Sequence, residues 1–562
     1  MNKAIQFLKQ KYNAQPLLCI LIIAAIPRIL AAIFSKGYAM HDDMFGPVQA
    51  MQDMLDDYST IENDTPRLML YPLVQYIVFA KCEFFGIYDP QIKMYFVRFL
   101  HAFYSLFVVF LGYKITQLIS DEKNARTVGI ILALLWILPF MSVHNLVETF
   151  SIPPLLAGVY YVLKYYKHTP SLWSGITYFS RHCGLDPRSP ELETVGAGFA
   201  CPTMNDNKGR ANLAPTKPQL SDRRGVLNTP TNTNTTNKYL LFAGLFFAFA
   251  FAIRFQTAFV PFGIGIVMLF YRQFKSFAIL ALSTIFIVSL FLAIPDYIFW
   301  EKPFGSLINY LDIKDMGSYP TNPWYMTTLL VVGVLIPPMG MMLFWGYLRN
   351  WKKHILLFLP VLIFIAFHSI YPNKQERFIL TILPLFIILG VIGWNEFVAK
   401  SEWWQNRKKL LKINWIWFWF FNSILLIIFT FSYSKKTRVE SLTYLSDKQV
   451  SGIVFELNES NIYFAPTFYL GKNRHKPTFN LNKNYLPEEI EQQFNNSKEK
   501  PNYAIFFDEG DLSERVERFE KNFNSRLDLI EVIEPGLLDK ILHFSNPKHN
   551  RNYTAYIYEI KN

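Results

Sequence analysis

The chain has 562 residues, which is too long for one ordinary soluble domain and long enough for two or more domains. Hydrophobic residues make up 51% and charged residues 17%, against about 25% charged residues in a soluble globular protein. Aromatic residues make up 17%, which excludes a disordered or collagen-like chain, and four cysteines exclude a disulfide framework. The net charge of +12 comes from short basic clusters between apolar runs, which is typical of a polytopic membrane protein and needs no nucleic acid.

The first apolar run, Leu17–Phe34, follows a basic segment without acids and is long enough to cross a membrane, which takes about 20 residues. It could instead be a secretory signal peptide. Pro27 and Arg28 interrupt its apolar centre, and no small-residue cleavage site follows. We therefore predict a retained helix whose N-terminal end lies in the cytoplasm.

Further apolar runs are spaced along the chain, some of them shorter than the first. Together with the first run they predict an all-α polytopic membrane protein of about 11 spans. The further runs are Val97–Leu118, Thr127–Met141, Thr149–Tyr166, Tyr239–Ile253, Phe255–Tyr271, Phe277–Ile294, Trp324–Gly346, Ile355–Ile370, Phe378–Ile392 and Ile413–Phe431.

The loops between these runs alternate in charge. Basic clusters at Arg272–Lys275, Arg349–Lys353 and residues 407–412 are assigned to the cytoplasm by the positive-inside rule. The loop of residues 35–96 carries more acids than bases, and we place it on the opposite, outer side.

One segment of this outer loop, Leu68–Tyr88, is apolar enough to suggest a further span. Lys81 and Glu83 interrupt it, so we interpret it as an amphipathic or re-entrant helix on the outer surface. If it crossed the membrane, every later loop would change sides.

Two segments are predicted to lie outside the membrane. Residues 167–238 are polar and rich in Pro, Gly, Asn and Thr, which predicts a disordered cytoplasmic insert. Cys183, Cys201 and His182 in this insert lack the paired spacing of a zinc site.

The last 129 or so residues have strand and helix patterns and predict a small α/β domain on the outer face. SGIVFEL, NIYFAPTFYL, NYAIFFD and TAYIYEI are predicted strands, and LSERVERFEKNF and GLLDKILHF are predicted helices. The expected organisation is a first membrane part with the outer loop (1–166), the insert (167–238), a second membrane part (239–433) and the α/β domain (434–562).

This topology brings an unusual set of ionisable residues to the outer ends of the spans. Ions near lipid are costly, so such groups usually have a function. They are Asp42, Asp43, His144, Glu148, Arg254, Asp296, His368, Lys374, Glu376 and Arg377.

The segment AMHDDMFG contains the acid pair Asp42 and Asp43. One of these carboxylates could act as a general base toward an acceptor hydroxyl. Alternatively, the pair could be part of a solvated acidic loop or a helix N-cap.

The segment HSIYPNKQERF gathers three potential cations, His368, Lys374 and Arg377, around a tight loop. Such a loop would suit a phosphate at the membrane surface. It could also be an interfacial anchor, although basic anchors are disfavoured on the outer side. Arg28 lies toward the outer end of the first span, where it could reach a lipid-linked phosphate or extend to the interface.

The long outer loop Pro295–Met326 is rich in Tyr, Trp, Asn and Asp. Aromatic faces with amide and carboxylate groups beside them suit a sugar, although an aromatic interfacial belt has the same composition. This loop resembles glycosyltransferase family 22, the lipid-phosphate-mannose-dependent mannosyltransferases of the GT-C superfamily. The matching residues are Asp296, Phe299, Asn309, Tyr310, Tyr319, Pro323, Trp324 and Tyr325, with Trp300 in place of the usual Tyr.

Other outer segments are similar to motifs of the same family. The segment His41–Gly46 resembles its Asp-Glu loop, with Asp43 in place of the Glu, and Asn373–Phe378 resembles its H-K-E-x-R-F loop. The segment Asn145–Thr149 is similar to the family's N-x-x-E-T, and Arg254 and Arg28 match its basic residues. The resemblance covers about residues 15 to 432 outside the insert.

The resemblance implies an inverting membrane glycosyltransferase that moves a hexose, most simply mannose, from a polyprenyl-phosphate carrier to a glycan or glycolipid acceptor. It implies Asp42 as the base, and Asp43 or Glu148 as the group that orients the acceptor. The resemblance further implies that no metal or cofactor is needed. We also expect a bacterial plasma membrane protein, because the sequence has no retention signal and its C-terminal part is predicted to be soluble, and the charge alternation of the loops places the active site on the extracytoplasmic face. The implied donor-phosphate ligands are Lys374, Arg377, His368, Arg254 and Arg28, and the implied sugar-binding residues are Asp296, Asn309, Tyr310, Tyr319, Trp324 and Tyr325.

Two other functions fit the composition. A polytopic transporter or lipid-carrier flippase is the main alternative, but the sequence has no internal repeat and its charges lie at the outer ends of the spans rather than at the midplane. A membrane scaffold whose C-terminal domain binds a partner leaves the outer charges unexplained.

Overall fold

The computed structural model describes residues 6, 10–58, 67–169, 233–312, 321–371, 374–458, 464–482, 500–547 and 550–561. Most of the predicted insert, residues 170–232, lies outside the described residues, so its disorder stays a prediction. Helices α9 (Val147–His168) and α11 (Thr233–Ile253) extend into the two ends of the expected insert.

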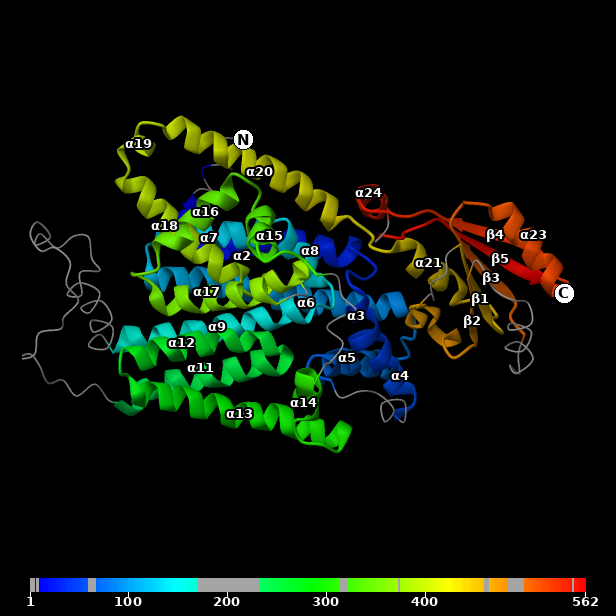
Figure 1. The fold of residues 1–562 in the computed structure, drawn as a ribbon, viewed down its shortest axis with the longest axis horizontal. Helices are drawn as coiled ribbons and strands as arrows, with labels where there is room; N and C mark the ends of the chain where they lie inside the picture. Colours follow the sequence, from blue (N-terminus) through cyan, green and yellow to red (C-terminus); the bar gives the residue numbers. More distant parts are fainter. Residues whose placement is uncertain are drawn as a thin grey trace, which may run out of the picture.

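The membrane part is a bundle of helices that run roughly side by side (Figure 1). Each predicted apolar run is mainly helical. The bundle consists of α2 (Pro16–Phe34), α6 (Pro90–Ile119), α7 (Glu122–Leu134) with α8 (Ile137–Val143), α9, α11, α12 (Phe259–Phe270), α13 (Phe274–Trp300), α15 (Met326–Val334) with α16 (Met339–Arg349), α17 (Ile355–Ile370), α18 (Leu383–Lys400) and α20 (Lys408–Thr430).

Among the described residues, six helices are long and apolar enough to cross a membrane, and eight if each bent pair counts as one span. The protein is therefore a multi-pass membrane protein. Its helices meet the length and composition of a span in fewer places than the predicted number of about 11. Two predicted spans are bent, by 55° between α7 and α8 and by 115° between α15 and α16. Pro337 and Pro338 lie at the second break, where they lack the amide donors that would continue a helix.

The outer loop folds into short helices between the bundle and the C-terminal domain (Figure 1). These are α3 (His41–Met44), the π-helical turn η1 (Phe45–Gln49), α4 (Ala50–Asp56) and α5 (Pro72–Phe84). Helix α5 has 13 residues and is too short to be a candidate span. This agrees with the interpretation of Leu68–Tyr88 as a helix that does not cross the membrane.

The C-terminal domain is an α/β domain, as predicted. Its five-stranded sheet has the order β2-β1-β3-β5-β4, with β1 parallel to both β2 and β3 and with β5 antiparallel to both β3 and β4. The strands are β1 (Ile453–Leu457), β2 (Thr478–Leu481), β3 (Tyr503–Phe507), β4 (Arg526–Ile533) and β5 (Ala555–Lys561), and the helices are α21 (Lys436–Leu445), α23 (Leu512–Phe523) and α24 (Leu537–Ser545).

One predicted strand of this domain is wrong. The end of NIYFAPTFYL, residues 467–470, belongs to the 3-10 turns of η6 (Thr467–Asn473), and Pro466 directly before these turns cannot donate to a strand ladder. Strands β2 and β4 and helix α21 were not predicted. Strand β2 has only four residues, and the edge strand β4 has charged residues and a bulge between Leu529 and Glu531, so neither has the regular apolar pattern of a central strand.

The C-terminal domain and the outer loop share one hydrophobic core. Tyr38, Met44 and Val48 from the loop pack in the same cluster as Val439 and Leu442 from α21. The C-terminal domain is therefore packed against the segment that carries the acid pair.

Candidate active site

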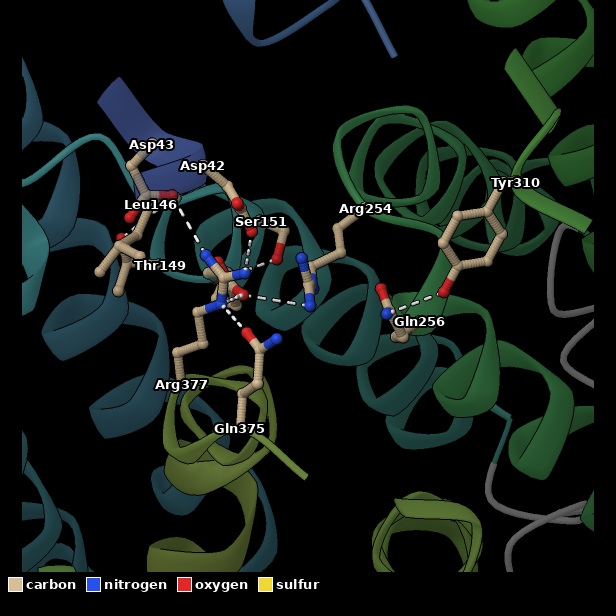
Figure 2. Close-up of polar contacts among 11 residues, drawn as sticks. Asp42, Asp43, Leu146, Thr149, Ser151, Arg254, Gln256, Tyr310, Gln375 and Arg377 are labelled. Carbon is tan, nitrogen blue, oxygen red and sulfur yellow. Dashed lines mark hydrogen bonds and ion pairs between the residues drawn. The ribbon is translucent and has the colours of Figure 1, made fainter. Parts of the chain in front are cut away.

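Five charged side chains from separate parts of the chain meet at the end of the bundle that faces the C-terminal domain (Figure 2). Asp42 and Asp43 lie on α3, Glu148 in the first turn of α9, Arg254 directly after α11 and Arg377 in the 3-10 turns η5 (Glu376–Thr381). All five were predicted from the sequence to lie on one side of the membrane, and the structure brings them into one cluster.

Arg377 is the centre of this cluster. Its Nη2 lies 2.5 Å from Asp42 Oδ2, its Nη1 3.5 Å from Asp43 Oδ1 and its Nε 3.2 Å from Glu148 Oε1. Gln375 adds a fourth contact, because its Oε1 accepts a hydrogen bond of 2.7 Å from Arg377 Nε. A planar guanidinium has donors for this number of acceptors, which a lysine ammonium could not match in the same geometry.

Arg254 extends the cluster from Glu148 to the Phe378 ring. Its Nη2 lies 3.1 Å from Glu148 Oε1, and its guanidinium lies 5.1 Å from the centre of the Phe378 ring. Glu148 is fully buried, and its place at the start of α9 lets the helix dipole favour its charge. Glu148 therefore connects the two arginines.

The adjacent carboxylates occupy different environments. The Asp42 side chain is 61% exposed and the Asp43 side chain only 4% exposed. Successive residues of a helical turn point about 100° apart, which puts one acid toward solvent and the other toward the protein. Burial and the nearby charge of Glu148 raise the pKa of Asp43 well above its ordinary value, although Arg377 opposes the shift. Asp43 is thus suited to hold a proton beside an exposed carboxylate.

Tyr310 lies beyond Arg254 on the side away from the acid pair (Figure 2). Its hydroxyl accepts a hydrogen bond of 2.9 Å from Gln256 Nε2, and its ring centre lies 4.9 Å from that of Phe255. Burial raises the pKa of Tyr310, and the nearby Arg254 opposes this shift. Tyr310, one of the residues predicted to bind sugar, is therefore within electrostatic range of the cluster. The structure thus associates Tyr310 with the site.

Other predicted site residues lie around the cluster rather than in it. The Lys374 ammonium donates to the carbonyl oxygens of Asn322 and Tyr371, both at 2.8 Å. His368 is buried, contacts the Phe364 carbonyl oxygen at 2.9 Å through Nδ1, and packs edge-on against Phe378. Lys374 therefore supports the segment that carries Arg377, and His368 supports the Phe378 ring, which lies against Arg254.

Among the described residues, Asp296, Trp324 and Tyr325 make no ion pair or hydrogen bond with the cluster. Asp296 accepts hydrogen bonds from the backbone N–H and the hydroxyl of Ser306, at 2.9 and 2.6 Å, and so fixes the start of α14 (Gly305–Asp312), the helix that carries Asn309. Trp324 and Tyr325 are 72% and 45% exposed. Tyr319 lies outside the described residues.

Arg28 does not join the cluster, contrary to the expectation of a phosphate ligand. Its guanidinium is buried and donates to Ser105 Oγ at 2.9 Å and to the carbonyl oxygens of Leu132 and Ala133 at 3.1 and 2.8 Å. These carbonyls lie in the last turn of α7, where the break before α8 leaves them without helical partners. Arg28 therefore stabilises a broken helix.

Two residues beside the cluster were not predicted as functional from the sequence. Gln375 lies in the segment that resembles the family's H-K-E-x-R-F loop, and Gln256 lies two residues after Arg254, but neither was assigned a role. No group of three or more His, Cys, Asp or Glu side chains that could hold a metal ion occurs in the described part of the chain.

Comparison with known proteins identifies the family of this chain. A family model described as the Alg9-like mannosyltransferase family matches residues 19–475. No curated protein matches the sequence. Crystal structures of ArnT from Cupriavidus metallidurans, apo and bound to undecaprenyl phosphate, superpose with TM-scores of 0.59 and 0.57 at 8% and 9% identity, over 97% of this chain and 98% of those chains.

The apo oligosaccharyltransferase of Archaeoglobus fulgidus also has a similar fold, with a TM-score of 0.50 and 9% identity over 90% of this chain and 71% of that chain. Identities this low describe a shared fold, which is of the GT-C type. The family match covers most of the sequence, including every charged residue of the cluster. The chain belongs to the Alg9-like mannosyltransferase family and is an integral membrane glycosyltransferase.

Proposed function

We propose that this enzyme transfers mannose, with inversion, from a polyprenyl-phosphate carrier to a hydroxyl group of a glycan or glycolipid acceptor. The observation that supports this most is the cluster of two arginines and three carboxylates at the outer end of the bundle. A transferase with a charged leaving group needs cations at the leaving oxygen and a base at the acceptor. The similar ArnT structure with bound undecaprenyl phosphate agrees with a lipid phosphate donor.

In this proposal, Asp42 accepts the proton as the acceptor O–H bond breaks. The acceptor oxygen then forms a bond to the anomeric carbon while the bond from that carbon to the phosphate oxygen breaks. The electron pair stays on the phosphate, whose growing negative charge is stabilised by Arg254 and Arg377. Asp43 or Glu148 orients the acceptor.

The other predicted site residues take supporting roles in this proposal. Lys374 and His368 hold the segment that carries Arg377 and Phe378 in place. Tyr310, together with Gln256, contacts the sugar or the carrier. Asn309, Trp324 and Tyr325 shape the surface that the sugar approaches, and Asp296 holds the start of α14. The transporter or flippase alternative leaves the cluster of two arginines and three carboxylates without a role.

A transfer assay tests the donor class directly. Purified enzyme in detergent should move mannose from citronellyl-phosphate mannose to a mannoside acceptor, with release of citronellyl phosphate. It should use a nucleotide-linked mannose poorly or not at all. Replacing mannose by glucose on the same carrier tests the sugar. Transfer from the nucleotide donor alone would reject the proposal.

We further propose that the enzyme lies in a bacterial plasma membrane with its active site on the extracytoplasmic face. The charge distribution of the short loops supports this orientation. In a background without the four native cysteines, Tyr58→Cys should react with an impermeant thiol reagent added outside, and Lys408→Cys only after permeabilisation. Both residues are exposed. Labelling of both from the same side would contradict the orientation.

A further inference from the structure

A lysine from the C-terminal domain lies beside the acid pair. Lys435 directly precedes α21, and its backbone N–H and that of Lys436 each donate to the Asp539 carboxylate at 3.0 Å. Asp539 is itself buried and receives a hydrogen bond from Asn552. The backbone at Lys435 is therefore fixed by the C-terminal domain.

The same segment is bound to the outer loop a few residues before the acid pair. Ser434 forms a parallel bridge with Gly37, and the Ser434 N–H donates to the Lys36 carbonyl oxygen at 3.0 Å. A Cβ atom at Gly37 would lie 1.9 Å from the Ser434 carbonyl oxygen, and the φ of +80° at Gly37 also requires glycine. This close approach holds Lys435 near the start of α3.

The Lys435 ammonium lies 4.4 Å from the centre of the Tyr38 ring. In the part of the chain that the structure describes, it has no carboxylate at ion-pair distance and no hydrogen-bond acceptor. Burial and the neighbouring Arg438 lower the pKa of Lys435 to about 8, whereas Asp43, Asp539 and Asp42 act in the opposite direction. The ammonium is thus within electrostatic range of the acid pair without pairing to either acid.

This distinguishes Lys435 from the two arginines of the cluster, which both contact carboxylates. A partly buried ammonium that is held by a rigid backbone and lacks a counter-ion is prepared for an anionic ligand, because burying an unpaired charge is costly. The aromatic ring beneath it offers only a partial substitute.

We infer that Lys435, from the C-terminal domain, binds an anionic group, a phosphate or a pyrophosphate, on the acceptor substrate. This inference rests on the proposed function. In a displacement with inversion, the base and the leaving phosphate lie on opposite sides of the anomeric carbon. Arg377 joins the two sides, because it contacts both Asp42 and Glu148, whereas Arg254 contacts Glu148. An anion held by Lys435 on the Asp42 side therefore belongs to the acceptor, and the donor phosphate lies on the Arg254 side.

Binding measurements on the full-length enzyme test this role. The donor-phosphate site is first saturated with citronellyl phosphate, and three probes are then titrated by calorimetry: methyl α-mannoside, its 6-phosphate, and mannose linked to dodecyl pyrophosphate. At least one anionic probe should bind wild type about tenfold or more tightly than the neutral mannoside, as expected for one charge-assisted hydrogen bond. Whichever anionic probe shows the difference identifies a soluble or a lipid-linked anion.

The variants separate this role from a structural one. Lys435→Met should lose the preference for the anionic probe, and Lys435→Arg should keep most of it. Lys436→Met is the matched control, because Lys436 neighbours Lys435 but lies 3.4 Å from Glu440 on the surface of α21. Its probe preference and its melting temperature should equal those of wild type.

The inference is overturned if wild type binds all three probes equally or none of them, or if Lys435→Met keeps the preference. Citronellyl phosphate should bind wild type and Lys435→Met with the same affinity. Failure of citronellyl phosphate to bind any of these proteins would instead count against the proposed function, so the two failures are distinguishable.

Discussion

Arg377→Ala is expected to lower kcat/KM for citronellyl-phosphate mannose by a factor on the order of 100 to 1,000, which is the usual loss when a donor that stabilises transition-state charge is removed. The phosphate is charged in the ground state and gains charge as the bond to carbon breaks. The substitution should therefore raise the donor KM and also lower kcat. Steady-state kinetics with varied donor measure both effects.

Removing Arg377 also leaves Asp43 and Glu148, both buried, without their shared cation. An uncompensated buried carboxylate costs several kcal/mol, so the melting temperature of this variant must be measured with its kinetics. Arg377→Lys keeps the charge but loses the planar arrangement of donors, and should restore only part of the activity. A folded Arg377→Ala enzyme with normal donor KM and kcat would remove Arg377 from the proposed site.

Arg28→Met is the appropriate control for loss of a buried arginine from this bundle. Its guanidinium is bound to Ser105 and to carbonyl oxygens of α7, and has no carboxylate partner among the described residues. The variant should lower the melting temperature without raising the donor KM. The comparison separates general loss of stability from loss of phosphate binding.

The convergence of the charged residues could be predicted because membrane topology limits where a residue can lie. Once the positive-inside rule assigned the sides, Asp42, Glu148, Arg254 and Arg377 all came to the same end of the bundle. Depth alone does not fix the direction of a side chain around its helix, which is why Arg28 was predicted to reach a phosphate but faces α7 instead.

The partners of each charge depended on tertiary contacts that the sequence does not contain. Asp296 occurs in a family motif, but its carboxylate is used by Ser306 ten residues later. The contact of Lys435 with Tyr38 joins residues almost 400 positions apart through a bridge at Gly37. Without an unusual local pattern at Lys435, no motif could have indicated it.

The overall fold was more predictable than its details. Long apolar runs predict helices because the membrane requires internally satisfied backbone hydrogen bonds. The breaks within two runs were not predicted, although Pro337 and Pro338 mark the second of them in the sequence. No proline lies between α7 and α8, where apolar residues continue across the bend. In the C-terminal domain, the buried central strands β1 and β3 were recognisable, whereas the short strand β2 and the bulged edge strand β4 were not.

The acid pair allows a second test with a large expected effect. Asp42→Asn should lower kcat by a factor on the order of 100 or more, with little change in donor KM, because removal of the acceptor proton is needed only in the transition state. The exposed position of Asp42 lets an acceptor reach it. The same substitution at Asp43 should be milder, since an amide has nearly the shape of the protonated acid that burial and Glu148 favour there.

The pH dependence distinguishes the two acids further. If protonated Asp43 orients the acceptor, wild-type activity falls as the pH rises through the raised pKa of Asp43, and this alkaline loss is absent from Asp43→Asn, whose amide does not titrate. If Asp43 is instead the base, activity falls as the pH decreases through that pKa, and Asp43→Asn is the inactive variant. Full activity of Asp42→Asn together with loss of activity in Asp43→Asn would move the base to Asp43. Full activity of the double variant would exclude both carboxylates, because neither amide can accept the acceptor proton.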